Sequence, residues 1–335
     1  MRSFFVNSLK VRVLGVVAAV AASISVAVPA AMSQSAAIRI DGSSTVFPLT
    51  EAAAEGFTKA TGGKTRVTVG VSGTGGGFKK FCRGETDISN ASRPIKSSEI
   101  AACKKAGIKF IEIPVAYDGL TVVINKQNTW AKNLTPAELK KIWEPAAQGK
   151  IKNWNQVRAG FPNVPLRLFA PGTASGTFDY FTEAINGKSG SSRGDVTSSE
   201  DDNVLVNGVI RDKGALSYFG YAYYEENKSK LQAATINGVP PTEANIRSGK
   251  YTPLSRPIFI YVSAKSANKP QVKQFVEYYI KNAPAINKKV AYVALPNTAY
   301  TAILNRFNRK QTGSVFGGKE KIGVKISELL ATPRD

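Results

Sequence analysis

The pattern that leaves this chain the fewest possible folds is a regular alternation of short apolar runs with amphipathic stretches. The runs at 38–40, 65–71 and 87–91 predict strands, and the stretches 47–60 and 97–105 predict helices. Such an alternation is typical of α/β proteins, in which the strands are mostly parallel because each helix carries the chain back across the sheet. The expected fold class is therefore α/β.

Two longer runs interrupt this alternation. Residues 115–125 and 252–264 each predict one extended strand. A molecule of two lobes, between which the chain crosses twice, would need two such strands. The predicted first lobe is discontinuous and consists of 36–118 plus 262–335, and the second lobe is 119–261.

The N-terminus has the features of a secretory signal peptide over residues 1–35. Arg2, Lys10 and Arg12 precede an apolar run at 13–28, and small residues follow where a leader peptidase could cut. The run is short for a membrane anchor, which needs about 20 apolar residues. No cysteine lies near the cleavage region, so no lipid anchor is expected. We expect a cleaved, soluble protein of the periplasm.

The chain has two cysteines and no histidine. An even number of cysteines in an exported chain predicts a disulfide between Cys82 and Cys103, with two buried free thiols as the alternative. The lack of histidine removes the Ser-His-Asp and Cys-His nucleophiles and the commonest transition-metal ligand. No catalytic residue, metal site or cofactor is expected.

The formal net charge is +21, and +18 remains without the leader, which holds three Lys or Arg and no acid. A charge of this size enriches small anions near the surface. Nucleic acid is not expected as a partner, because the lysines are scattered without an aromatic-studded motif. Most of them are expected to form a solvated surface on a monomer.

Three segments rich in Ser, Thr and Gly stand where a predicted strand passes into a helix. We call 41–48 the first turn, 71–77 the second and 172–178 the third. The first N–H groups of a helix lack partners within it, and the helix dipole adds partial positive charge there. Glycine permits close approach and hydroxyls add donors, so such turns can hold an anion. Each alone is an ordinary cap or loop, but their joint occurrence favours an anion site.

Arg93 directly follows the strand predicted at 87–91. A guanidinium matches a tetrahedral oxyanion in geometry and charge, and residues after the strands of such sheets meet ligands. The alternative is an arginine that forms only a structural salt bridge.

The motifs occur in a fixed order along most of the chain, from 38 to about 304. They are DGSSTVFP at 41–48, VGVSGTGGG at 69–77, DISNASRPI at 87–95, SGTFDYF at 175–181, EDDN at 200–203 and GALSYFGYAY at 214–223. In this order they resemble the phosphate-binding receptors of Pst-type ABC phosphate importers. The resemblance implies a type II periplasmic-binding-protein fold. Its two lobes, each a mostly parallel sheet flanked by helices, are joined by two crossing strands and close over phosphate by hinge bending.

The resemblance also implies which residues bind phosphate. Some members carry, in place of Arg93, an aspartate that accepts the proton of hydrogen phosphate, and many carry an arginine in place of Pro171. Arg93 is therefore expected to supply the missing guanidinium. Asp118, at the start of the first crossing strand, is the candidate proton acceptor, with a hinge or salt-bridge role as its alternative. The remaining expected phosphate-binding residues are Ser44, Thr45, Val46, Ser72, Gly73, Ser175, Gly176 and Thr177.

The function expected from the resemblance is capture of inorganic phosphate and its delivery to a membrane permease, without enzymatic activity. One alternative is a receptor for another tetrahedral anion such as sulfate or arsenate. A secreted phosphatase using Ser44 or Ser175 is a weaker alternative, because the sequence has no Gly-x-Ser-x-Gly elbow and no evident cluster of metal ligands. A surface-coating protein would use the basic surface but not the three turns.

Overall fold

The computed structural model describes residues 37–319, 324, 326–331 and 333. The predicted signal peptide, 1–35, lies outside the described residues. Within the described part of the chain, no helix combines the length and the apolar character needed to cross a membrane.

One large mixed sheet organises the described chain. Its strands are β1 (Ile38–Gly42), β2 (Val67–Val71), β3 (Ile88–Ala91), β4 (Phe110–Asn125), β6 (Arg167–Pro171), β7 (Thr197–Ser199), β8 (Ala215–Gly220), β9 (Leu231–Ala233) and β11 (Ser255–Ser263). The order is β2-β1-β3-β11-β4-β8-β6-β7, and β9 pairs with β4. The short strands β5 (Asn133–Leu134) and β10 (Thr235–Ile236) form a separate pair. The α/β class predicted from the sequence is confirmed.

The outer strands are parallel and the central strands are antiparallel. β1 pairs in parallel with β2 and β3, and β6 pairs in parallel with β7 and β8. β11 runs antiparallel to β3 and to β4, and β4 runs antiparallel to β8. β4 pairs with β11 as far as Gly119 and with β8 from Leu120 onward. The two long strands predicted from the sequence therefore form the centre, and β4 joins the two parallel groups.

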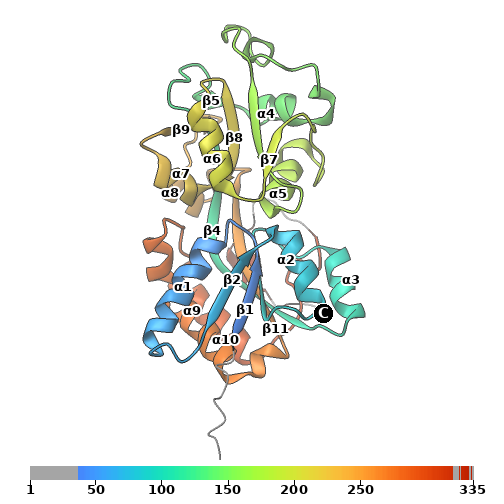
Figure 1. Cartoon of the computed structure of the whole chain (residues 1–335), viewed down its shortest axis with the longest axis vertical. Helices are drawn as coiled ribbons and strands as arrows, with labels where there is room; N and C mark the ends of the chain where they lie inside the picture. Colours follow the sequence, from blue (N-terminus) through green and yellow to red (C-terminus); the bar gives the residue numbers. More distant parts are fainter. Residues whose placement is uncertain (1–36, 320–323, 325, 332, 334–335) are drawn as a thin grey trace, which may run out of the picture. The chain divides into compact units, whose positions relative to one another are not determined.

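Eleven helices lie within the described residues. They are α1 (Phe47–Ala60), α2 (Gly73–Cys82), α3 (Ser97–Lys105), α4 (Pro136–Trp143), α5 (Gly176–Asn186), α6 (Asp202–Arg211), α7 (Tyr221–Asn227), α8 (Glu243–Arg247), α9 (Pro270–Lys289), α10 (Asn297–Asn308) and α11 (Ile326–Leu329). Figure 1 shows α1, α2, α9 and α10 grouped with β1, β2 and β11, and α4, α5 and α6 grouped with β7 and β8. The strands that precede the three turns are β1, β2 and β6, and the helices that follow are α1, α2 and α5.

Helix α9 extends beyond the end that the sequence predicts. The sequence predicts an end near residue 281, but α9 continues through Pro284 to Lys289. Ala283, Ile286 and Asn287 are buried in this last part, and the Asn287 side chain donates to the Val115 carbonyl at 3.1 Å. Burial and this contact with β4 stabilise the helix beyond a proline that alone would favour its end.

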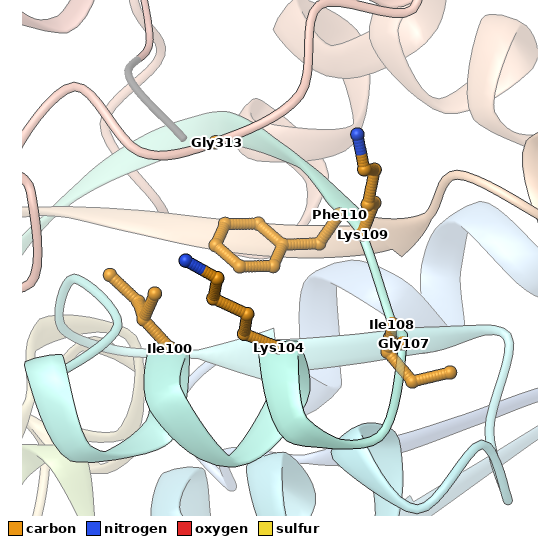
Figure 2. Close-up of a pocket in the computed structure, with 7 residues that line it drawn as sticks. All are labelled: Ile100, Lys104, Gly107, Ile108, Lys109, Phe110 and Gly313. Atoms are coloured by element: carbon orange, nitrogen blue, oxygen red, sulfur yellow. The ribbon is translucent and has the colours of Figure 1, made fainter.

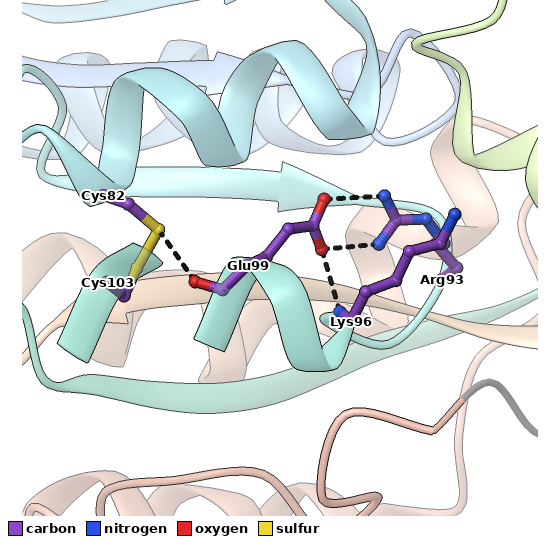
Figure 3. Close-up of a disulfide and its surroundings, with 5 residues drawn as sticks. All are labelled: Cys82, Arg93, Lys96, Glu99 and Cys103. Atoms are coloured by element: carbon purple, nitrogen blue, oxygen red, sulfur yellow. Dashed lines mark hydrogen bonds and ion pairs between the residues drawn. A yellow bond between two sulfur atoms is a disulfide. The ribbon is translucent and has the colours of Figure 1, made fainter. Parts of the chain in front are cut away.

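The disulfide predicted between Cys82 and Cys103 is present. Cys82 ends α2 and Cys103 lies in α3, so the bond fixes these helices to each other. Glu99 lies one turn before Cys103 on α3, and its carboxylate meets the guanidinium of Arg93 (Figure 3). The disulfide thus holds the helix from which this carboxylate projects.

Removal of the disulfide should destabilise the protein by about 3 kcal/mol, because it closes a loop between residues 21 positions apart. Urea unfolding of the Cys82→Ala/Cys103→Ala variant should show this loss of unfolding free energy. Reduction of the wild type should give the same loss and leave the double variant unchanged. Equal stability of wild type and variant would contradict the prediction.

Candidate functional site

The three turns meet at one place. The hydroxyl oxygens of Thr45, in the first turn, and Thr177, in the third, are 2.9 Å apart, and both residues are fully buried. The second turn joins them, because the N–H of Gly75 donates to the carbonyl of Ala174 at 2.9 Å. Segments far apart in the sequence therefore bring their donors together.

Backbone donors at two helix starts stay unused among the described residues. No acceptor in this part of the chain meets the N–H groups of Thr45 and Val46, which precede α1, or that of Gly176, which begins α5. These are the groups that helix geometry leaves without internal partners. Together with the dipoles of α1 and α5, they form an environment that favours an anion.

The hydroxyls of the third turn are oriented as donors. Thr177 Oγ1 accepts from Arg256 Nη2 at 2.7 Å, and Ser175 Oγ accepts from the Thr177 N–H at 3.1 Å. Because each oxygen already accepts one hydrogen bond, its own hydrogen can be directed elsewhere. This arrangement is suited to a ligand that presents hydrogen-bond acceptors to the third turn.

Two glycines permit the close approach of the turns. A Cβ atom on Gly176 would lie 2.5 Å from Thr74 Oγ1 and 2.6 Å from Ser92 Oγ. Gly73 has a φ of 72°, and a Cβ there would lie 2.6 Å from the Ala174 carbonyl oxygen. A side chain at either position would push the second and third turns apart.

The guanidinium closest to this meeting point belongs to Arg256, on β11, which the sequence analysis missed. Arg256 is 1% exposed and also donates to the Gly176 carbonyl at 2.9 Å. Its Nη2 and Nε lie 3.1 and 3.3 Å from Asp118 Oδ2. Arg256 is the one charged residue in the strand predicted at 252–264, and this was the signal that could have identified it.

Asp118 forms the buried ion pair with Arg256 across β4 and β11. Its second oxygen, Oδ1, accepts from the N–H of Tyr221 at 3.0 Å. The geometry of Asp118 thus corresponds to the salt-bridge alternative that the sequence left open.

Arg93 is 2% exposed and its donors are directed to protein acceptors. Two of its nitrogens bind Glu99 at 2.8 Å each (Figure 3). Nε binds Asp179 at 2.8 Å, and Nη1 also donates to the Pro94 carbonyl. Burial opposes its charge, but the bonds to Glu99 and Asp179 outweigh burial and raise the pKa of the guanidinium above its usual value. Arg93 therefore connects Glu99 on α3 with Asp179 near the start of helix α5.

Ser72 and Ser44 face carboxylates. Ser72 donates to Asp41, which also binds Lys80 at 2.7 Å. Ser44 Oγ lies 3.5 Å from Oδ2 of Asp202, the first residue of α6. Burial raises the pKa of Asp202 to about 7; the charge of Asp118 adds to the rise and that of Arg256 opposes it.

A separate pocket lies beside α3 and does not include any of the three turns. Figure 2 shows its lining, with the Phe110 ring between the side chains of Lys104 and Lys109. The remaining lining residues are Ile100, Gly107, Ile108 and Gly313. Among the described residues, no cluster of His, Cys, Asp and Glu could hold a metal ion.

Breaking the central ion pair should strongly destabilise the protein. Arg256→Met leaves the Asp118 carboxylate buried without its cation, and we expect a loss of about 3–5 kcal/mol in the free energy of unfolding. The double variant Asp118→Asn/Arg256→Met should lose clearly less, because neither member of this pair then leaves an unpaired charge in the interior. Urea unfolding measures both, and Arg83→Met, which removes an exposed ion pair with Glu85, is the control. Equal losses in the single and double variants would contradict the prediction.

Comparison with known sequences identifies similar proteins over most of the chain. A model of the PBP superfamily domain matches residues 27–283. Protein SphX of Synechococcus elongatus is 54% identical over 319 residues, which cover 94% of each chain. The phosphate-binding protein PstS of Staphylococcus saprophyticus is 37% identical over 272 residues, covering 79% of this chain and 82% of that protein.

Two solved structures resemble the described fold. A possible phosphate-binding protein from Planctomyces limnophilus is 48% identical, with a TM-score of 0.62 over 82% of this chain and 98% of that one. A putative phosphate ABC transporter substrate-binding protein from Clostridium perfringens, solved with bound phosphate, is 25% identical. Its TM-score is 0.68 over 78% of this chain and all of that one.

Proposed function

Because the chain belongs to the PBP superfamily and, within it, to the PstS-like phosphate-binding proteins, we propose that it captures inorganic phosphate and delivers it to the permease of an ABC importer. The family and the type II periplasmic-binding-protein fold expected from the motifs are confirmed. Proteins of this type bind substrates and do not transform them, which supports a role without catalysis.

One observation carries the proposal: hydroxyls and unpaired N–H groups from two distant turns meet in front of a buried guanidinium. Thr45 and Thr177 are 2.9 Å apart, and Arg256 donates to Thr177 at 2.7 Å. Phosphate oxygens accept hydrogen bonds from all three kinds of group, and charge-assisted bonds of this kind are the stronger ones.

The site residues follow from this arrangement. We assign Arg256 as the guanidinium that supports the anion-binding hydroxyls, and Arg93 as a positioning residue that holds α5 through Asp179. The proposed direct donors come from all three turns. They are Ser44, Thr45, Val46, Ser72, Gly73, Ser175, Gly176 and Thr177. The Ser72 hydroxyl, which donates to Asp41 without the anion, would exchange that acceptor for phosphate.

A phosphate between the two threonines requires the turns to separate. Each hydroxyl would lie about 2.7 Å from a phosphate oxygen, so the two could not also remain in contact with each other. The change of partner in β4 between Gly119 and Leu120 supports a hinge near the predicted lobe boundary at 118/119. β11 pairs with β3 and β4 from Ser255 to Ser263, which supports placing the second boundary before 255 rather than at 261/262.

We further propose that the protein is exported, is soluble in the periplasm without a lipid anchor, and acts as a monomer. The signal-peptide features of residues 1–35 support export. The net charge of +18 that remains without the leader would raise the local concentration of anions and the rate at which they reach the site.

Isothermal titration of the purified protein with phosphate, arsenate and sulfate tests the proposal. We expect tight binding of phosphate and weaker binding of sulfate. Arsenate, which has the same shape and charge as phosphate, should also bind. Incubation with a chromogenic phosphate ester and divalent metal ions should give no turnover. Absence of binding to any tetrahedral anion, or hydrolysis of the ester, would refute the proposed function.

Variants that each lack one hydroxyl should show which threonines contribute to phosphate affinity. Thr45→Val and Thr177→Val each remove one donor to a charged ligand, so phosphate affinity should fall about tenfold or more. Thr301→Val, on the exposed side of α10, should leave affinity unchanged. Titration calorimetry measures all three, and unchanged affinity in both site variants would exclude the threonine pair as the phosphate site.

A further inference from the structure

The Asp202 side chain is buried next to the first turn with half of its carboxylate unused. It is 1% exposed, and Oδ2 lies 3.5 Å from Ser44 Oγ. The other oxygen, Oδ1, is buried and has no hydrogen-bond partner among the described residues. A buried carboxylate oxygen without a donor costs free energy, so this site is incomplete without a donor.

The groups around Asp202 do little to stabilise the negative charge of its carboxylate. Arg256 on β11 is the cation that faces it, but the hydrogen bonds of this guanidinium go to Asp118, Gly176 and Thr177. The other groups facing Asp202 carry negative charge or are phenols. They are Asp118 on β4, Glu200 and Asp201 in its own segment, Tyr223 on α7 and Tyr292 after α9.

The hydroxyls of Tyr223 and Tyr292 do not donate to Asp202 Oδ1 either. Tyr223 donates to the Ser44 carbonyl at 3.1 Å, and Tyr292 donates to the Thr45 carbonyl. Both rings therefore hold the backbone of the first turn against the carboxylate. The donor that Asp202 lacks would have to arrive beside the first turn, where Ser44 Oγ contacts the other carboxylate oxygen.

We propose that Asp202 accepts a hydrogen bond from the hydroxyl of a protonated phosphate, and that it thereby selects protonated oxyanions against sulfate. This inference rests on the proposed function and assigns its selectivity. Phosphate and arsenate carry at least one O–H near neutral pH, whereas sulfate carries none. Sulfate would place an oxygen lone pair against the carboxylate, which adds repulsion and leaves Oδ1 without a donor.

Asp118, the acceptor suggested by the sequence, is less suited to this role. Both of its oxygens are bonded to protein, one to the Tyr221 N–H and one to Arg256. Asp202 has the opposite environment, with one weak contact and one free oxygen. The difference in hydrogen bonding, more than distance from the turns, distinguishes the two acids.

The protonation of Asp202 adds a second, independent consequence. Burial raises its pKa to about 7, so the side chain gains a proton as the pH falls below neutrality. A protonated Asp202 is a donor and no longer repels a fully ionised anion. Affinity for sulfate should therefore rise as the pH is lowered from about 8 to about 5, because the pKa of Asp202, about 7, lies between these values.

The test compares Asp202→Asn with Asp201→Asn by calorimetric titration of phosphate and sulfate at pH 8. Asp201 is the neighbouring exposed acid that caps α6, and asparagine preserves such a cap. Asp202→Asn should weaken phosphate about tenfold or more, as for loss of a hydrogen bond to a charged group. It should leave sulfate equal or tighter. Asp201→Asn should leave the phosphate-to-sulfate ratio as in the wild type.

The outcomes separate the inference from the function on which it rests. A wild type that binds neither anion refutes the proposed function. A selective wild type with a folded Asp202→Asn variant of unchanged selectivity overturns the inference alone, as does an equal change in Asp201→Asn. If Asp202→Asn fails to fold, the pH series on the wild type decides: a rise in sulfate affinity below about pH 7 supports Asp202, and a flat profile overturns it.

Discussion

The buried ion pair between Arg256 and Asp118 connects the centre of the sheet to the anion-binding turns. The two residues face each other in the register of β11 and β4, and their side chains are 1% and 0% exposed. Removing both charges from water is costly, and the Coulomb attraction alone rarely offsets it. Here the remaining donors of Arg256 reach Gly176 and Thr177. The pair therefore orders the start of α5 as well as satisfying two charges.

Each of the two guanidiniums near the turns is balanced by protein acids. Arg93 is bonded to Glu99 and Asp179, and Arg256 to Asp118. An anion among the three turns would then be held chiefly by N–H and O–H dipoles, since little positive charge is left uncompensated. Dipoles fixed by the fold stabilise charge without being rearranged when it arrives. The same balance limits affinity for any anion that offers charge alone, which is consistent with selection by hydrogen bonding.

The sequence was informative wherever the signal is local. The starts of helices α1, α2 and α5 could be predicted because prolines, glycines and hydroxyl residues act within a few positions. The disulfide could be predicted because the exported chain has only two cysteines. Thr135 and Glu138, for example, cap α4 reciprocally, as their spacing indicates. The role of Arg256 depends on the register between β4 and β11, which connects residues 138 positions apart. Periodicity within one strand does not contain that register.

The partners of Arg93 and Asp202 could not be predicted from the sequence for a related reason. Arg93 meets Asp179, which is 86 positions away, and Ser44 meets Asp202, which is 158 positions away. The sequence correctly indicated that an arginine follows β3, but it did not indicate which residues Arg93 and Asp202 would meet. Whether each side chain points to a ligand or to another residue depends on how the parallel strand groups pack through β4.

The start of α5 is where the contacts from both strand groups converge, and this has an energetic consequence for binding. Thr177 contacts the first turn, Ala174 the second, Asp179 meets Arg93, and Gly176 meets Arg256. An anion that enters between Thr45 and Thr177 replaces their mutual hydrogen bond with bonds to itself, while the contacts of Arg93 and Arg256 can persist. A ligand shifts a conformational equilibrium only by its difference in affinity between the two states. Since much of the contact network exists without the anion, the difference must come from the few donors that change partners, so those donors, rather than the buried ion pairs, set how far anion binding shifts the equilibrium.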